Sequence, residues 1–334
     1  MKTRLYDIPD ETCLHECAEI IKKGGTVIFP TETVYGLGAN ALDAAAVDKI
    51  FLAKGRPGDN PLIIHLHDME MLGRYVKEMP DVLHMLSKLY MPGPLTVVLY
   101  KKDIIPMNVT AGLDTVACRI PDNDIARKLI EYSGVPIAAP SANISGKPSP
   151  TRYTHVVNDM NGKVDAIING GNCKIGVEST VLDLTSQTPT ILRPGGVPYD
   201  RLKLVIKDLK TAYTFTGTPK SPGMKYRHYA PKAEMYLLKG KDEDVIKKIN
   251  ELTDKNTGVL CCREDFDRYT SLNKLCVGSR NDPYEIASNI FECLRCFDEM
   301  NIDQIYSEYF DITDIGEAVM NRLTKAAGGR IFEV

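Results

Sequence analysis

The stretch KGRPGDNPLIIHL (residues 54–66) places Lys54 and Arg56 two positions apart, directly before an apolar run. A turn needs Gly, Pro, Asp or Asn, but it does not need two cations. Asn60 lies in the same loop, and His65 lies near the end of the apolar run. The pattern favours a basic loop that holds an anion at the end of a strand. The alternative is a solvated loop with incidental charge.

A second polar stretch, PSANISGKPSPT (140–151), follows the apolar residues PIAA. It carries hydroxyl side chains and Asn143 around Gly146. Short side chains with exposed backbone N–H groups can form a nest that binds an anion. The alternative is an ordinary Ser/Gly/Pro loop.

Three arginines, Arg56, Arg119 and Arg193, lie next to predicted strands. The planar guanidinium fork matches carboxylate and phosphate groups. The sequence therefore predicts a site for a phosphate or carboxylate ligand.

The sequence does not support a dinucleotide-binding fingerprint, a P-loop or a zinc site. The G-x-G-x-x-A within PTETVYGLGANA (30–41) begins six residues past its strand, and no acidic residue closes a second strand about twenty positions on, so a dinucleotide fingerprint is not indicated. No P-loop motif occurs. Cys293 and Cys296 form a C-x-x-C within a predicted helix, without a second pair at zinc-site spacing, and we expect no metal site there.

The elements that must position these residues alternate irregularly. Strands are predicted at TVIFPT, PLIIHL, PLTVVLYK, DTVACRIP, PIAAPS, DAIING, STVLDL and TILRPG, and helices at ETCLHECAEIIKK, DAAAVDKIFLAK, PDVLHMLSKLY and NDIARKLIEYS. Because strands often follow one another, we expect an α/β (α+β) fold with a twisted mixed sheet. We predict no strand within GLGANA.

The chain is long enough for two domains. We predict a catalytic domain over 1–210, a linker over 211–231, and a smaller Rossmann-like α/β domain over 232–334 with helices at 242–253, 282–301 and 316–327. The linker is long for a plain connection, so we expect residues 217–231 to act as a lid.

The composition indicates a folded protein, with 43% hydrophobic and 25% charged residues. The formal net charge of −3 does not suit a general polyanion binder, so local placement must hold any phosphate. The nine cysteines indicate reduced thiols. No export signal or membrane-spanning run is present, and we expect a cytoplasmic protein.

Seven stretches in order resemble the motifs of the YrdC family, the L-threonylcarbamoyladenylate synthases: GGTVIFPTETVYGLGANA, KGRPGDNPLIIHL, MPGPLTVVL, ACRIPDN, PIAAPSANISGKPSPT, GVESTVLDL and ILRPGGV. SPGMKYRHYAPKAE and EAVMNRLTKAAGGRI are similar to the long, two-domain form. One departure is Cys118, where we expect a small aliphatic residue, and it puts a thiol close to the site.

The resemblance implies a nucleotidyltransferase that converts L-threonine, bicarbonate and ATP into L-threonylcarbamoyladenylate and pyrophosphate. Mg²⁺ is expected to be carried with ATP. The product is expected to pass to a tRNA-modifying threonylcarbamoyl transferase, which modifies the adenosine beside the anticodon. A tRNA contact is not required, and no membrane partner is implied.

The resemblance also implies roles for individual residues. The residues similar to the family's threonine pocket are Thr33, His65, Arg119, Ala139 and Ser179. Those that resemble ATP contacts are Lys54, Arg56, Asn60, Thr115, Ser141, Asn143, Ser149, Arg193 and Tyr226, and His228 belongs to the lid. The structural alternatives are a strand histidine with satisfied hydrogen bonds at His65 and ordinary linker residues at Tyr226 and His228.

Two other functions compete with this interpretation. A double-stranded RNA or tRNA-binding protein without catalysis is disfavoured by the near-neutral charge and the lack of Trp for base stacking. Carbamoyl transfer, as in larger multidomain relatives, would need zinc-finger-like and acylphosphatase-like segments, which this chain lacks. Threonine-dependent pyrophosphate release distinguishes the synthase from both.

Overall fold

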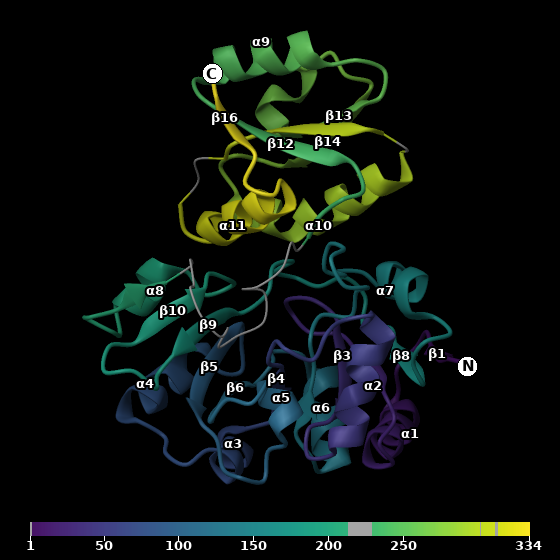
Figure 1. Ribbon diagram of the computed structural model, residues 1–334, viewed down its shortest axis with the longest axis vertical. Coiled ribbons are helices and arrows are strands. Elements are labelled where there is room, and N and C mark those ends of the chain that lie inside the picture. The colour runs from purple at the N-terminus through teal and green to yellow at the C-terminus, as the bar shows by residue number, and fades with distance from the viewer. Residues whose placement is uncertain (1, 213–228, 301, 311–312) are drawn as a thin grey trace. The chain divides into compact units, whose positions relative to one another are not determined.

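The larger of the two sheets has eleven strands in a computed structural model that describes residues 2–212, 229–300, 302–310 and 313–334. The chain divides into two units, one formed by Met1–Ser145 and Pro150–Lys225 and the other by Gly146–Ser149 and Tyr226–Val334. Each unit has its own sheet (Figure 1). The predicted domain boundaries at 210 and 231 stay predictions, and most of the predicted linker lies outside the described residues.

The sheet of the first unit contains both parallel and antiparallel pairs, as predicted for a mixed sheet. Its strands are β1 (Arg4–Tyr6), β2 (Val27–Phe29), β3 (Gly36–Asn40), β4 (Ile63–His65), β5 (Leu95–Tyr100), β6 (Thr115–Arg119), β7 (Ile137–Ala138), β8 (Ala166–Ile168), β9 (Thr180–Asp183), β10 (Thr190–Arg193) and β11 (Lys210–Thr211). Their order is β1-β8-β2-β3-β7-β4-β6-β5-β9-β10-β11. The α/β fold prediction is confirmed.

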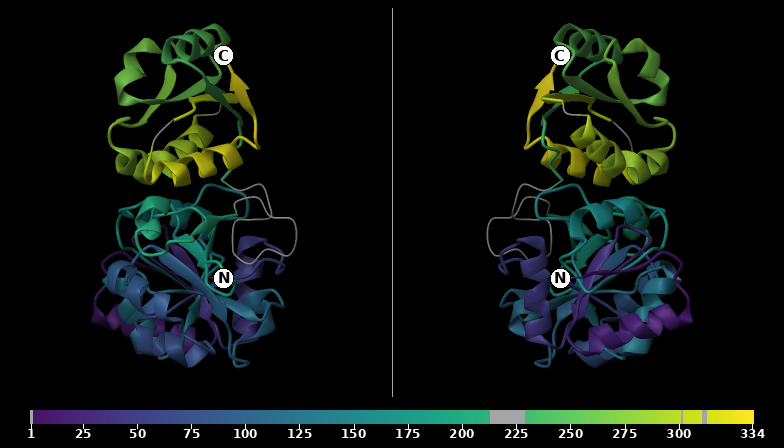
Figure 2. Two further views of the ribbon diagram at one scale, coloured as in Figure 1. Left: turned by 90° about the vertical axis from the view of Figure 1, so that its left-hand side faces the viewer. Right: turned by 90° about the vertical axis from the view of Figure 1, so that its right-hand side faces the viewer.

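The helices of the first unit begin where the sequence supplies capping residues. Asp10, Asp43 and Asn123 each accept a hydrogen bond from a backbone amide in the first turn of the helix that follows, which stabilises a helix by about 1 kcal/mol. Both side views show helices packed along the sheet (Figure 2). The helices are α1 (Glu11–Lys22), α2 (Ala44–Lys54), α3 (Met69–Tyr75), α4 (Asp81–Tyr90), α5 (Met107–Thr110), α6 (Asp124–Ser133), α7 (Tyr153–Met160) and α8 (Tyr199–Lys203).

Strand β3 corrects the sequence analysis, which predicted no strand within GLGANA. It pairs antiparallel with β2 and β7. A Cβ atom at Gly38 would lie 2.6 Å from Ile137 and 2.7 Å from the ring of Phe29. Glycine is therefore required by the close approach of its neighbours, although its low strand propensity hides the strand from sequence reasoning.

Side chains on the central strands β4, β5, β6 and β9 alternate between two hydrophobic clusters, because successive residues of a strand point to opposite faces. One face joins the main core through Ile64, Val97, Cys118 and Leu182. The other face carries a smaller cluster made of Ile63, Val98, Ala117, Val181 and Leu192. We call this second face the site face.

This alternation decides the position of Cys118. Its side chain is fully buried in the main core, whereas Arg119, the next residue, belongs to the site face. Burial raises the pKa of the Cys118 thiol, which keeps it protonated at neutral pH. The sheet therefore separates the thiol from the side chain of Arg119, and the expected closeness of this thiol to the site stays a prediction.

The second unit has a five-stranded parallel sheet, and the predicted Rossmann-like α/β domain is confirmed. Its elements are β12 (Glu234–Lys239), α9 (Asp242–Leu252), β13 (Thr257–Cys262), the 3₁₀ helix η1 (Arg263–Arg268), β14 (Asn273–Gly278), α10 (Pro283–Glu299), β15 (Gln304–Glu308), α11 (Gly316–Ala326) and β16 (Ile331–Glu333). The strand order is β14-β13-β15-β12-β16. Helix α9 covers one face, and α10 and α11 cover the other (Figure 1). In the described part of the chain, no helix is long and apolar enough to cross a membrane.

Candidate active site

His65 and Arg119 lie side by side on the site face. They end the strands β4 and β6, which lie next to each other in the sheet (Figure 1). These strands are parallel, and the two residues are register partners. Each residue is 3% exposed. Burial, and next the charge of Arg119, lowers the pKa of His65 to about 3, so its imidazole is neutral near pH 7. Among the described residues, Nδ1 of His65 has no hydrogen-bond partner.

Glu32 lies against Arg119, although the sequence analysis gave it no role. One carboxylate oxygen, Oε2, is 2.8 Å from Nη2 of Arg119, and both side chains are at least 95% buried. The contact lacks hydrogen-bond geometry: within the described part of the chain, both Glu32 oxygens and Nη2 of Arg119 have no hydrogen-bond partner. Nε of Arg119 reaches the carbonyl oxygen of Gly93 at 3.4 Å. The pair is therefore balanced in charge but not in hydrogen bonds.

Ser179 is held from two sides immediately before β9. Its hydroxyl is 2.7 Å from the hydroxyl of Thr96, which lies directly opposite Arg119 in the β5–β6 pair. Arg193 donates from Nε and Nη2 to the carbonyl oxygen of Ser179, at 3.1 and 2.8 Å. The register therefore brings Ser179 to the same face as Arg119.

Thr33 and Ala139 complete the predicted threonine pocket. Thr33 is fully buried between β2 and β3, and its hydroxyl is 2.9 Å from that of Thr31. The amide of Ala139 donates to the carbonyl oxygen of Ile63 at 2.9 Å, which fixes Ala139 beside β4. The roles predicted for these residues stay predictions.

Lys54 connects two of the predicted nucleotide loops. It ends α2, and its ammonium group donates to the carbonyl oxygens of Ser141 and Asn143 at 2.5 and 2.7 Å. The hydroxyl of Ser141 donates to Oδ1 of Asn143 at 2.6 Å. Three predicted ATP contacts are thus brought together across 87 residues of sequence.

Arg56, Asn60 and Thr115 were also predicted as nucleotide contacts. Nη2 of Arg56 donates to the carbonyl oxygen of Asn60 at 3.0 Å, which closes the basic loop. Thr115 begins β6 on the site face, at the opposite end from Arg119. With about 3.3 Å per residue, the two Cα atoms are roughly 13 Å apart. The structure therefore does not bring Thr115 next to the predicted threonine pocket.

The last predicted contacts are divided between the described and undescribed parts. Ser149 is fully buried and belongs to the segment Gly146–Ser149, which groups with the second unit. Tyr226 and His228 lie outside the described residues. The same holds for the predicted lid over 217–231, apart from its last three residues. Their roles stay predictions.

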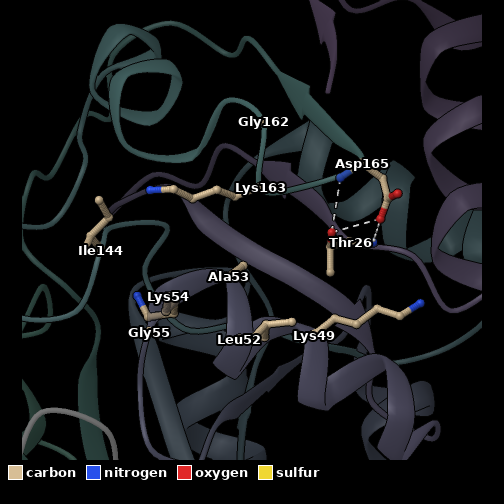
Figure 3. A pocket seen from close by; sticks show the side chains of 10 residues that line it. All are labelled: Thr26, Lys49, Leu52, Ala53, Lys54, Gly55, Ile144, Gly162, Lys163 and Asp165. Atoms are coloured by element: carbon tan, nitrogen blue, oxygen red, sulfur yellow. Dashed lines mark hydrogen bonds between the residues drawn. The ribbon is translucent and has the colours of Figure 1, made fainter. Parts of the chain in front are cut away.

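A pocket of about 520 Å³ lies beside the end of α2 (Figure 3). Lys54 and Gly55 line it on one side and Lys163 on another, with the Lys163 side chain extended toward Ile144 (Figure 3). Its lining contains none of the predicted threonine residues. The pocket is therefore separate from the site face.

Comparison with known proteins shows the family of this chain. A family model described as "Telomere recombination" matches residues 19–195, and one described as "Threonylcarbamoyl-AMP synthase, C-terminal domain" matches residues 197–328. The threonylcarbamoyl-AMP synthase of Pyrococcus abyssi is 49% identical over 335 residues, which cover 97% of each chain. The chain belongs to the threonylcarbamoyl-AMP synthase family. The resemblance to the long, two-domain form of the YrdC family is thereby confirmed, as is the prediction of a nucleotidyltransferase-type enzyme.

Other members of the threonylcarbamoyl-AMP synthase family match over the whole chain. The Bacillus subtilis enzyme is 43% identical over 345 residues, covering 99% of this chain and all of the relative. The crystal structure of P. abyssi Sua5 complexed with L-threonine superposes with a TM-score of 0.94 at 47% identity, covering 100% of this chain and 99% of that one.

Sequence reasoning missed two polar neighbours of the predicted residues. Glu32 stands between two threonines after a buried strand, and this carboxylate among hydroxyls was an available signal. No sequence pattern indicated Thr96, because only its pairing with Arg119 across β5 and β6 brings it to the site face.

Proposed function

We propose that this protein joins L-threonine, bicarbonate and ATP to form L-threonylcarbamoyladenylate and pyrophosphate. The observation that carries the proposal is the set of buried polar groups with unmet hydrogen bonds on and beside the site face, namely Glu32, His65 and Arg119, in a member of this enzyme family. Such groups are rare in native proteins and are explained when a polar ligand binds them. A relative was crystallised with L-threonine, which supports threonine as that ligand.

The threonine site is proposed around Arg119. The guanidinium would bind the substrate carboxylate, since arginine forks match carboxylates. Neutral His65, Thr33 and Ser179 would supply uncharged hydrogen bonds to the rest of the molecule, and Ala139 would limit its size.

The nucleotide site is proposed along the basic loop and the loop at 141–143. Arg56 would neutralise phosphate charge directly, with Asn60, Thr115, Ser149, Arg193 and Tyr226 as further contacts. Lys54 would act mainly by holding the two loops together, because its ammonium group already donates to the backbone of Ser141 and Asn143. Mg²⁺ would enter with ATP as part of the substrate.

The chemistry requires two steps. The threonine ammonium group and bicarbonate give a carbamate, one water and one proton. A carbamate oxygen then attacks the α-phosphorus of ATP, a P–O bond forms, and pyrophosphate leaves. Neither step needs a covalent bond to the protein, so positioning and charge neutralisation supply the catalysis. Buried, directionally fixed donors suit this role.

The product would be passed to a tRNA-modifying threonylcarbamoyl transferase in the cytoplasm. The alternative of RNA binding without catalysis is not favoured by the comparisons, since relatives along the whole chain are named as synthases. The proposal is tested by pyrophosphate release with ATP, Mg²⁺ and bicarbonate. We expect release to require L-threonine, and release at the same rate without any amino acid would overturn the proposal.

A further inference from the structure

The buried carboxylate of Glu32 has no role in the threonine site as proposed above. We propose that Glu32 binds the α-ammonium group of the amino-acid substrate, so that Glu32 and Arg119 together recognise a zwitterion. This inference rests on the proposed function and names the groups that select its substrate.

The first step is the unmet hydrogen bonding of Glu32. An ionised carboxylate can only accept hydrogen bonds. Both oxygens are buried, and among the residues that the structure describes neither receives one. A buried acceptor left in this state destabilises the protein, so a donor is expected when the site is in use.

The second step is that the neighbouring hydroxyls are already engaged. Thr31 donates to the carbonyl oxygen of Val34 at 2.6 Å, and the hydroxyl of Thr33 is 2.9 Å from that of Thr31. The 2.8 Å contact with Arg119 supplies charge but no aligned N–H group. A substrate ammonium group offers three donors at once.

The third step is the balance of charge. Glu32 and Arg119 carry opposite formal charges, and burial keeps His65 neutral near pH 7. Cys173, whose thiol senses both charges, also stays protonated because burial raises its pKa to about 12. A site without net charge suits a ligand without net charge. A zwitterionic amino acid meets both partners, whereas a hydroxy acid offers Glu32 one uncharged donor and brings a net negative charge into the site.

The test compares two ligands that differ only at the α-substituent. L-Threonine and (2S,3R)-2,3-dihydroxybutyrate, which has a hydroxyl in place of the ammonium group, are titrated calorimetrically into the full chain with a non-hydrolysable ATP analogue present. Glu32→Gln keeps the side-chain size and removes the charge. We expect wild type to prefer threonine by about 100-fold or more and Glu32→Gln to lose about 30- to 100-fold of its threonine affinity, since a buried charge-assisted hydrogen bond is lost.

Two controls separate recognition from folding. The affinity for the ATP analogue should stay within about twofold of wild type in Glu32→Gln. Glu131→Gln, on the exposed side of α6, should change the affinity for neither threonine nor its hydroxy analogue. If Glu32→Gln does not fold, Glu32→Asp retains the charge on a shorter side chain, and we expect it to keep a reduced preference for threonine.

The outcome that overturns the inference is an unchanged ratio of the two affinities in a folded Glu32 variant. That result would leave the proposed function intact if pyrophosphate release by wild type still requires threonine. A wild-type protein that binds neither threonine nor its analogue, and releases pyrophosphate without an amino acid, would instead refute the proposed function itself.

Discussion

Arg193 holds Ser179 through three hydrogen bonds. Nε and Nη2 both donate to the carbonyl oxygen of Ser179, at 3.1 and 2.8 Å, and Nη2 also donates to its hydroxyl at 3.1 Å. Both residues are at least 95% buried. The predicted roles divide these residues between ATP and threonine, but the geometry joins them, and Arg193 is therefore also a positioning residue for Ser179.

The first prediction follows from this fork. Lysine keeps the charge of Arg193 but cannot donate from two nitrogens to one oxygen. We expect Arg193→Lys to lower kcat/KM for threonine by about 10- to 100-fold, which corresponds to about 1.4–2.7 kcal/mol. Steady-state pyrophosphate release at varied threonine measures this. Arg201→Lys, an exposed substitution in α8, is the matched control. Equal kinetics in both variants would show that the fork does not position Ser179.

Local signals made the helices α1, α2 and α6 predictable. Asp10, Asp43 and Asn123 cap the helices that follow them, and such caps depend only on residues within one turn. The buried strands β4 and β6 were equally readable, because each is a short apolar run that ends in a polar residue. Strand β3 was missed because its glycines are dictated by Phe29 and Ile137, which no local pattern reveals.

The contacts within the site could not be read from the sequence. Lys54 meets Ser141 and Asn143 after 87 and 89 residues, and Glu32 meets Arg119 only because the sheet folds them together. Gly195 is a further example: a Cβ atom there would lie 2.3 Å from the backbone of Ser179 and Thr180, so the close approach that Arg193 exploits requires glycine. The residue types indicated a site for phosphate and carboxylate groups, but the contacts between distant residues depend on the tertiary fold.

The second prediction concerns the basic loop. Arg56→Ala removes the proposed charge opposite the phosphates, and we expect ATP turnover to fall by about 100-fold or more, because such a contact contributes about 2–4 kcal/mol. Initial rates at varied ATP measure the loss. Arg74→Ala, which removes an exposed arginine paired with Glu70 in α3, should leave turnover unchanged. A large fall in the melting temperature of Arg56→Ala with normal activity per folded molecule would assign Arg56 a structural role.

The third prediction concerns His65 and pH. Its pKa of about 3 in the folded protein lies below the ordinary value of 6.5, so the folded state binds fewer protons than the unfolded state between these values. The contribution of neutral His65 to the free energy of unfolding is therefore fully present above pH 6.5. It decreases by about 1.4 kcal/mol per pH unit as the pH falls from 6.5 toward 3. Urea unfolding of the full chain at pH 7, 6 and 5 should show a steeper loss in wild type than in His65→Asn.

The control for this measurement is His84→Asn, because His84 is exposed in α4. It should follow the wild-type pH dependence. If wild type and His65→Asn lose stability in parallel from pH 7 to pH 5, His65 is not a buried neutral histidine.

The second unit contains a charged cluster at the carboxyl ends of its strands, where α/β sheets usually bind ligands. Nη2 of Arg280 lies 2.5 Å from Asp265 and 2.7 Å from Glu308. Burial raises the pKa of Glu308 to about 7, although Arg280 opposes this shift. The neighbouring pocket has a volume of only about 10 Å³, room for about one water.

The fourth prediction is that this cluster stabilises the second unit. Arg280→Met leaves the buried Glu308 without the arginine beside it and leaves Asp265 with Arg268 alone. We expect a loss of about 3–5 kcal/mol in the free energy of unfolding. Adding Asp265→Asn and Glu308→Gln should recover most of it. Urea unfolding, followed by a signal from the second unit, measures the loss in Arg280→Met and its recovery in the triple variant. Arg263→Met, at an exposed arginine paired with Glu285, should have little effect. An equal effect of the two arginine substitutions would contradict the role of the buried cluster.

The proposed reaction links threonine, a carboxyl group from bicarbonate and AMP in one product. The most direct test is mass spectrometry of the adenylate formed from ¹³C-bicarbonate, L-threonine and MgATP, with quenching within seconds. We expect a threonine-containing adenylate that carries the label in its carbamoyl carbon and forms with one equivalent of pyrophosphate. An adenylate without the label, or label and pyrophosphate that appear without threonine, would contradict it.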